Sequence, residues 1–135
     1  MLTTIEFETP AGDALLNITD LVQSAIQHMG IPSGLCALIV PHTTAAITIN
    51  SSLDPTTPDD IVNDVRRLVP TRVDFKHQYD TPADAAGHIK STLIGQSVLL
   101  VVDNGSLLLG GSQSILFYEF DGPRTRRVQI KVIPG

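Results

Sequence analysis

The sequence predicts one α+β domain over residues 1–135, in which a mixed β-sheet or sandwich is combined with about three helices. A chain of 135 residues matches the usual size of a single domain. Apolar residues recur at helical spacing in the segments 19–29, 57–69 and 83–93. Residues 98–133 are instead short apolar runs separated by turn residues, which is typical of β-strands. Because helices and strands are largely segregated along the chain, the α+β class is favoured.

Local signals mark the ends of the predicted helices. In the segment 19–29 the apolar residues lie on one helical face, and Gly30 follows as a C-terminal signal. Thr57 is the predicted N-cap of the second helix, which has a proline at its first position and ends at Pro70. The third helix, 83–93, is short and is closed by a glycine.

The predicted strands are apolar runs or alternating segments, and they cover residues 5–8, 35–40, 45–49, 98–102, 107–109, 115–120 and 127–133. The sequence Asp103-Asn104-Gly105-Ser106 is the strongest hairpin signal in the chain. These strands exceed what a few short helices can cover. Part of the sheet surface is therefore expected to be covered by another subunit.

Composition argues against several classes of protein. The net charge of −5 argues against a nucleic-acid partner, because such proteins normally carry a basic face. The only cysteine, Cys36, lies in the apolar run 35–40 and is interpreted as a buried structural thiol in a reducing compartment. The first residues lack the basic region of a signal peptide, and no apolar run approaches the ~20 residues of a membrane span. A cytoplasmic protein without a membrane partner is expected.

Histidines are the clearest candidates for chemistry. Of the four, His28 lies near the end of a predicted helix and is interpreted as structural or solvent-facing. His42, His77 and His88 lie where the apolar patterns break, and three neutral imidazoles with an open position are typical of catalytic zinc. Their spacings of 35 and 11 residues match no local metal signature. Spacing alone therefore leaves three separate, individually satisfied polar residues as an alternative.

Five segments resemble motifs of the YjbQ family, in order and over nearly the whole chain. Residues 41–50, with Asp54 downstream, resemble a His-Thr-Ser/Thr-Ala strand and loop, and His77 matches the histidine of a Tyr-Arg-His segment. Residues 87–95 resemble an Ala-His-Ile/Leu-Lys helix, and residues 109–115 resemble a Leu-Gly-Thr-Trp-Gln-Gly-Ile segment. Residues 119–124 resemble a closing Glu-Phe-Asp-Gly-Pro-Arg.

This chain departs from the family motifs at several positions. Phe75 and Lys76 replace the tyrosine and arginine before the histidine, and Ser112 replaces the tryptophan. Ser51 and Ser52 stand where the family usually has Glu and Asn. These changes remove a carboxylate and a stacking surface, but they leave the three histidines intact.

The resemblance implies a homotrimer with a pocket in which His42, His77 and His88 gather around a divalent metal ion. Zinc is the first choice, with magnesium as the alternative for a phosphorylated substrate. It also implies a weak thiamine-phosphate synthase activity, which joins a hydroxymethylpyrimidine diphosphate to a thiazole phosphate with loss of diphosphate. Two other functions stay open: a non-catalytic trimeric module that binds a metal or small anion, and a metal-dependent hydrolase.

A phosphorylated substrate needs cations that take up developing negative charge. Arg124 follows the turn Gly122-Pro123, where its guanidinium could bind phosphate through two hydrogen bonds. Lys90 follows His88 on the predicted helix and either contacts phosphate or lies at the surface. For the neighbouring Arg126 and Arg127, the simpler interpretation is that one of them is a solvated charge on an edge strand.

The remaining site candidates are polar residues beside predicted strand ends. Asp54 is a candidate to orient a ligating histidine or to act as an acid or base, although a turn-forming role beside a proline is equally possible. Glu119, between two aromatic residues, is interpreted mainly as solvent-facing, although the resemblance to the family's closing motif also makes it a weak site candidate. The substrate-binding candidates are Thr43, Thr44, Asn50 and Gln113.

Overall fold

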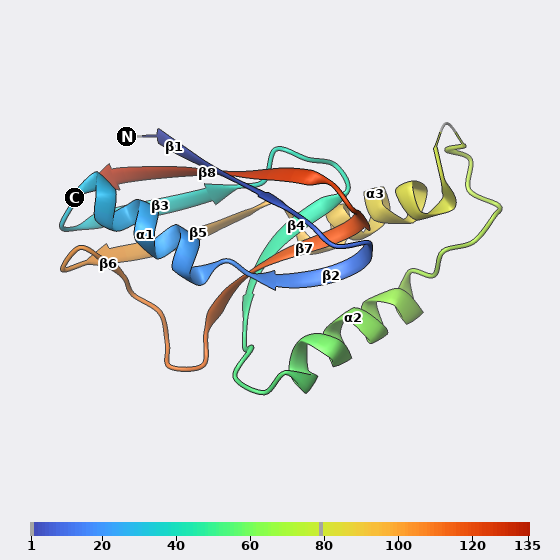
Figure 1. Cartoon of the computed structure of the whole chain (residues 1–135), viewed down its shortest axis with the longest axis horizontal. Helices are drawn as coiled ribbons and strands as arrows, with labels where there is room; N and C mark the ends of the chain where they lie inside the picture. The colour runs from blue at the N-terminus through green and yellow to red at the C-terminus, as the bar shows by residue number, and fades with distance from the viewer. Residues whose placement is uncertain (1, 79) are drawn as a thin grey trace.

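The structure is a computed structural model that describes residues 2–78 and 80–135. Within these residues it contains three helices and eight strands (Figure 1), which confirms the predicted α+β class. In chain order the elements are β1 (Leu2–Glu8), β2 (Gly12–Asn17), α1 (Thr19–Met29), β3 (Gly34–Ile39), β4 (Ala45–Asn50), α2 (Thr56–Leu68), α3 (Pro82–Ile94), β5 (Ser97–Asp103), β6 (Ser106–Leu107), β7 (Ser114–Gly122) and β8 (Thr125–Pro134).

The strands form two sheets that enclose the main core. The large sheet has the order β1-β8-β3-β5-β6 and the small sheet the order β2-β7-β4, and each described pairing is antiparallel. Leu38 of β3 and Phe117 of β7 are fully buried in this core. Cys36 is buried there as well, which raises the pKa of its thiol to about 11 and agrees with a structural role. Strand β8 lies between β1 and β3 and is not an edge strand, but β3 pairs with it only as far as Gln129, so Arg126 and Arg127 have β1 alone as a neighbouring strand.

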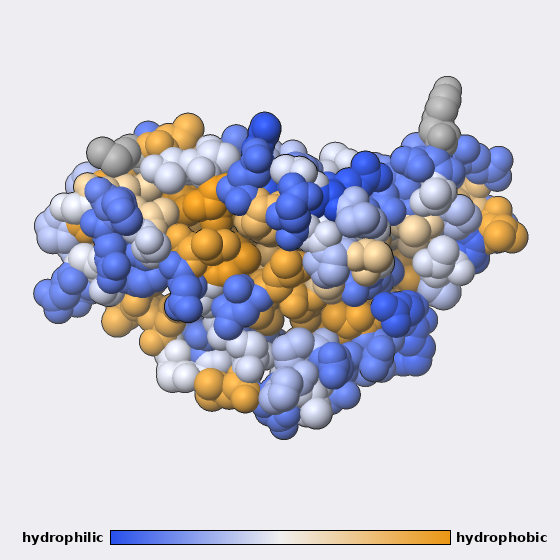
Figure 2. Space-filling model, viewed as in Figure 1, coloured by the Kyte–Doolittle hydropathy of each residue, from blue (hydrophilic) through white to orange (hydrophobic). Residues whose placement is uncertain are grey.

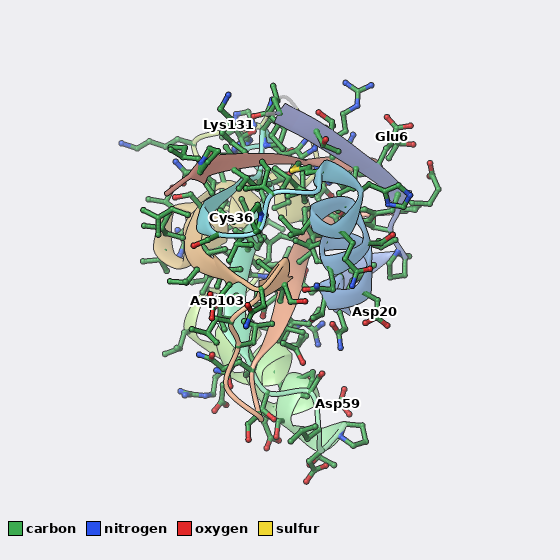
Figure 3. All side chains as sticks on the ribbon, turned by 90° about the vertical axis from the view of Figure 1, so that its left-hand side faces the viewer. Glu6, Asp20, Cys36, Asp59, Asp103 and Lys131 are labelled. Atoms are coloured by element: carbon green, nitrogen blue, oxygen red, sulfur yellow. The ribbon has the colours of Figure 1, made fainter. Side chains whose placement is uncertain are left out.

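Helix α1 closes one side of the sandwich, where Val22 and Ile26 are completely buried in the main core. Figure 3 shows this helix beside the two sheets, with Cys36 in the interior. The His28 imidazole donates from Nδ1 to the Ser24 carbonyl at 2.8 Å, as expected of a histidine in a last helical turn. A shallow groove of about 380 Å³ separates α1 from β1, and Figure 2 shows apolar residues at the surface on this side.

Helices α2 and α3 form a third layer on the outer face of the small sheet. Tyr118 and Phe120 of β7 point into this second core, where their rings lie 4.3 Å apart between centroids. Both faces of the small sheet are therefore covered, and β7 is buried along most of its length.

The outer face of the large sheet is covered by no helix among the described residues. Its central strands carry apolar residues there, in register with one another: Leu35 pairs with Val101 and with Ile133, and Leu99 lies two residues from Val101 along β5. These four side chains are 45%, 44%, 59% and 66% exposed, respectively. We call them the outer apolar face. This arrangement leaves a large apolar surface available to another molecule.

The main differences from the expected elements are local. Strand β2 was not predicted, and helix α2 begins at Thr56, without the expected side-chain cap from Thr57. The Asp54 carboxylate instead accepts hydrogen bonds from the Thr56 N–H and hydroxyl at 2.9 and 2.7 Å.

No helix in the described part of the chain combines the length and apolar character needed to cross a bilayer.

Candidate functional site

Helix α3 provides two of the three side chains of the candidate site. It begins with Thr81 as N-cap, whose hydroxyl accepts from the Asp84 N–H at 3.2 Å, followed by a proline. Gly87 lets the helix pack closely, because a Cβ there would lie 3.3 Å from the Cβ atoms of Thr44 and Phe120. Asp84 and His88 are four residues apart and thus share one helix face, toward the segment that contains His77.

The three side chains meet at a single carboxylate oxygen. His77 Nε2 lies 2.8 Å from Asp84 Oδ2, and His88 Nε2 lies 3.2 Å from the same atom. The two imidazole rings are perpendicular within about 10°, with an interplanar angle of 81° and centroids 5.0 Å apart. All three ligand atoms lie within 4.8 Å of one another. For metal–ligand bonds of ~2.1 Å, adjacent ligand atoms are separated by roughly 3.0–3.4 Å, so the three residues fit a divalent ion.

The charge state of Asp84 suits this role. Burial opposes ionisation of its carboxyl group, but the hydrogen bond from His77 and the charges of both histidines outweigh burial and hold its pKa below the ordinary value. The carboxylate is therefore ionised at neutral pH. A metal ion bound there would replace the protons that the two imidazole nitrogens share with it.

His42 lies apart from this group. Its Nε2 accepts a hydrogen bond from the backbone N–H of Arg127 at 2.9 Å. His42 and His88 line the same pocket, of about 460 Å³, but among the described residues His42 belongs to neither candidate metal group. Partial burial and the charge of Arg126 hold the pKa of His42 below its ordinary value. The structure brings His77 and His88 together around Asp84, without His42. A metal site made of all three histidines therefore stays a prediction.

A buried ion pair lies behind His42. Glu119 is 0% exposed and Arg126 4% exposed, and the Arg126 guanidinium donates to both carboxylate oxygens and to Thr44. The Thr9 hydroxyl also donates to Glu119, at 2.6 Å. Burial opposes ionisation of Glu119, but these hydrogen bonds outweigh burial and hold its pKa below the usual range. The interpretation of Glu119 as solvent-facing is therefore wrong, and Thr44 contacts Arg126, whereas Thr43 lines the pocket.

Arg124 lies at the edge of the candidate site. Its guanidinium contacts the Asp121 carboxylate at 2.8 Å and the Asp80 carboxylate at 3.9 Å. Asp80 and Asp121 form a second potential ligand group with Asp84. The hydrogen bond to Asp121 raises the pKa of Arg124 above its ordinary value. Arg124 is thus a permanent cation within reach of the metal group, with a side chain 44% exposed.

Lys90 points away from the site. Two residues along a helix rotate the side-chain direction by about 200°, so Lys90 and His88 lie on opposite faces of α3. The Lys90 ammonium is 1% exposed and contacts the Asp13 carboxylate at 2.7 Å, beneath Arg66 of α2. It ties α3 to β2 and is not at the phosphate-binding position considered for it.

Three other candidates lie at the opposite end of the small sheet. Asn50 ends strand β4, about 17 Å along the strand from its start near His42 at ~3.4 Å per residue. Gln113 lies near Asn50, because its neighbour Ser114 pairs with Asn50. Asp54, the third candidate, follows Asn50 in the chain. The contacts of all three are local: Asn50 accepts from the Ser51 N–H, Gln113 from the Gly110 N–H and Asp54 from the Thr56 N–H. Within one subunit these residues do not join the histidines.

Asp84, the carboxylate of the candidate metal group, was not identified from the sequence. Its signal was present, because Asp84 and His88 are four residues apart on a correctly predicted helix. Asp80 and Asp121 carried no comparable signal, since Asp80 precedes α3 and Asp121 lies near the end of β7, far away in the sequence.

Comparisons with known proteins cover the whole chain. Residues 3–135 match the family model described as UPF0047 protein YjbQ-like. The chain is 40% identical to the UPF0047 protein YugU of Bacillus subtilis, over 98% of this chain and 99% of that protein. It is 39% identical to a UPF0047 protein of Methanocaldococcus jannaschii, over 98% of this chain and 94% of that protein.

Solved structures give the same result for the fold. A hypothetical protein from Aeropyrum pernix K1 superposes with a TM-score of 0.93 at 34% identity, over 100% of this chain and 99% of that one. A YbjQ-like protein of unknown function from Sulfolobus solfataricus superposes with a TM-score of 0.92 at 28% identity, over 100% and 97%. The descriptions of these relatives name no reaction and no ligand.

Proposed function

Because the chain belongs to the YjbQ-like UPF0047 family, we propose that it is a divalent-metal-dependent transferase acting on a small phosphorylated substrate, in the manner of a thiamine-phosphate synthase. The observation that carries this proposal is the contact of Asp84 Oδ2 with the Nε2 atoms of both His77 and His88. Two imidazoles and one carboxylate are a ligand set that zinc enzymes use, so zinc is the first choice and magnesium the alternative.

The residues around the group have distinct roles in this proposal. A bound metal ion would supply Lewis-acid stabilisation of the charge that develops on a diphosphate leaving group. Arg124 adds a fixed cation whose planar guanidinium is suited to phosphate oxygens, although Asp121 and Asp80 compete for it. The 460 Å³ pocket beside His88 is large enough for a small heterocyclic substrate.

A metal-dependent hydrolase is the second candidate, and one observation favours it. Lys90 is bound to Asp13, which leaves Arg124 as the described cation next to the metal group. Transfer between two phosphorylated molecules needs more positive charge than activation of a single water molecule. The set of two histidines and one carboxylate is also that of zinc peptidases.

Metal content and catalysis of three proteins test the proposal: the untagged wild type, Asp84→Asn and the exposed control Asp64→Asn in α2. We expect the wild type and Asp64→Asn to bind one zinc ion per chain, and Asp84→Asn to bind it at least ~100-fold more weakly, because loss of a ligand exceeds the effect of losing its orienting partner. Thiamine phosphate formed from the two phosphorylated precursors should depend on the metal.

The other outcomes separate the alternatives. Metal binding with hydrolysis of a phosphate monoester, and no transfer, supports the hydrolase. Metal binding without either reaction supports a non-catalytic binding module. A wild type that binds no divalent metal contradicts the proposal.

We further propose a homotrimer as the assembled form. The outer apolar face exposes Leu35, Leu99, Val101 and Ile133 on central strands of the large sheet, where a folded subunit would gain by covering them. The other proposed partner is the small phosphorylated substrate. Neither a nucleic acid nor a membrane is proposed as a partner. A cytoplasmic location stays a prediction from the sequence.

A further inference from the structure

We infer that His42 is a substrate-binding residue rather than a metal ligand, and that its Nδ1–H donates a hydrogen bond to an oxygen of the molecule bound beside His88. This inference rests on the proposed function, because it assigns the metal to His77, Asp84 and His88. It differs from a site of three histidines in the role of one residue, which makes the two arrangements separable by experiment.

The hydrogen bond to Arg127 determines which nitrogen of His42 carries the proton. A neutral imidazole has one N–H donor and one nitrogen with a free lone pair. Because Nε2 accepts from the Arg127 N–H at 2.9 Å, its lone pair is occupied and the proton lies on Nδ1. A metal ion binds through a lone pair, so neither nitrogen of His42 offers one in this arrangement. The lowered pKa of His42 is consistent with a neutral ring.

The fold explains why this hydrogen bond forms. Strand β3 pairs with β8 up to the pair Ile39–Gln129 and then ends, whereas β8 extends four residues further in that direction, to Thr125. The chain turns away after β3, and the His42 ring takes the Arg127 N–H that a longer β3 would have bound. The ring is therefore held in place by backbone geometry, beside the pocket that it shares with His88.

The pocket contains donors that suit an oxygen-rich ligand. Nδ1 of His42 has no hydrogen-bond partner in the described part of the chain, since the Arg127 contact involves Nε2. Thr43 and Gln96 line the same pocket and carry a hydroxyl and an amide donor, whereas the Thr92 hydroxyl donates to the His88 carbonyl at 2.9 Å. The lining among the described residues includes no carboxylate. An anionic group such as a phosphate ester would accept from these donors without electrostatic repulsion from the lining. The chemical class that fits is therefore a phosphate monoester bound next to the metal.

Three variants separate a ligand-donating role from a metal-binding role. His42→Gln can accept from the Arg127 N–H at the position of Nε2 but lacks the donor at Nδ1. His42→Asn places an amide donor near the position of Nδ1 and loses the acceptor at Nε2. His88→Ala is the control that removes a metal ligand. Each protein is titrated with Co²⁺, followed by visible absorption, and the Co²⁺-loaded protein is then titrated with phenyl phosphate.

We expect both His42 variants to bind Co²⁺ within about threefold of the wild type, and His88→Ala to bind it at least ~100-fold more weakly. Phenyl phosphate should bind about tenfold or more weakly to His42→Gln, because a hydrogen bond to a charged group is lost, and His42→Asn should retain most of the affinity.

Each contrary result has a distinct meaning. If both His42 variants lose Co²⁺ as His88→Ala does, His42 is a metal ligand and this inference is overturned, while the proposed metal site stands. If His42→Gln keeps both affinities, the donor role is also wrong. If the wild type itself binds no Co²⁺, the proposed function fails, and the inference fails with it.

Discussion

Two adjacent arginines on β8 have very different environments. Arg126 is buried on Glu119, with further bonds to Thr44, whereas Arg127 pairs with Glu6 at the surface, where both side chains are more than half exposed. The difference follows from alternation along the strand, which turns one residue into the sandwich and the next toward solvent. The pair of arginines is therefore a matched comparison of a buried and an exposed ion pair.

Replacement of Arg126 by methionine should destabilise the protein by about 3–5 kcal/mol, because it leaves the buried Glu119 carboxylate without its cation. Arg127→Met should cost less than about 1 kcal/mol, as is usual for exposed pairs. Urea denaturation of the two variants checks this. Addition of Glu119→Gln to Arg126→Met should recover part of the lost stability. Equal stabilities of Arg126→Met and Arg127→Met would contradict the argument.

At this scale the sequence identified the types of residue in the site better than their partners. The three histidines were visible as candidates, because His42 follows an apolar run, His77 lies in a polar stretch and His88 lies on a predicted helix. The partner of Glu119 was not visible in the sequence. The alternation of Glu119 with Tyr118 and Phe120 predicts an exposed carboxylate, but that prediction holds only where one face of the strand meets water. Strand β7 has packed layers on both faces, which alternation along one strand cannot indicate.

Among the elements, helix α2 is the most weakly attached. It contains no buried residue, whereas α3 has six, including Asp84 and Lys90. Its contacts with the small sheet are a partly buried apolar stripe, which contains Ile61, Val62 and Val65, and an ion pair of Arg66 with Asp13 at 3.8 Å. Local opening of α2 therefore exposes little apolar surface.

Amide hydrogen exchange should distinguish the two helices. We expect the amides of α2 to exchange on the order of 10–100 times faster than those of α3, because opening α2 does not require opening the main core. Exchange followed by mass spectrometry of peptides from each helix is the measurement. Similar protection in both would mean that α2 unfolds only with the whole domain.

The helices were predictable because their periodicity and end signals agreed, and the strands β3 to β8 because they are apolar runs. Strand β2 was missed for a physical reason: its central residues, from Asp13 to Leu16, are all partly buried, so no alternation marks them. The convergence of His77 with α3 also lay beyond the sequence, since residues 70–78 follow an irregular path that no periodicity describes.

For the whole molecule, the outer apolar face determines the expected assembly. Leu99→Lys places a charge within this face, and burying that charge in an interface is costly. We expect the wild type to have a mass three times 14.5 kDa and the variant to have the mass of a single chain. Light scattering on a size-exclusion column provides the masses. Leu53→Lys, at an exposed loop position, is the control and should assemble like the wild type, while a trimeric Leu99→Lys protein would place the interface elsewhere.

The central place of β8 has a consequence for how the protein is made. Of the strands described above, β1 leaves the ribosome first, yet its only neighbour in the large sheet is β8, the last to be synthesised. Strand β3 also waits for β8 on one of its sides. Until then both strands present unpaired backbone groups, which are sites for association with other chains. The large sheet is therefore completed only once β8 has been synthesised, and a chain shortened at Arg124 lacks a central strand of that sheet.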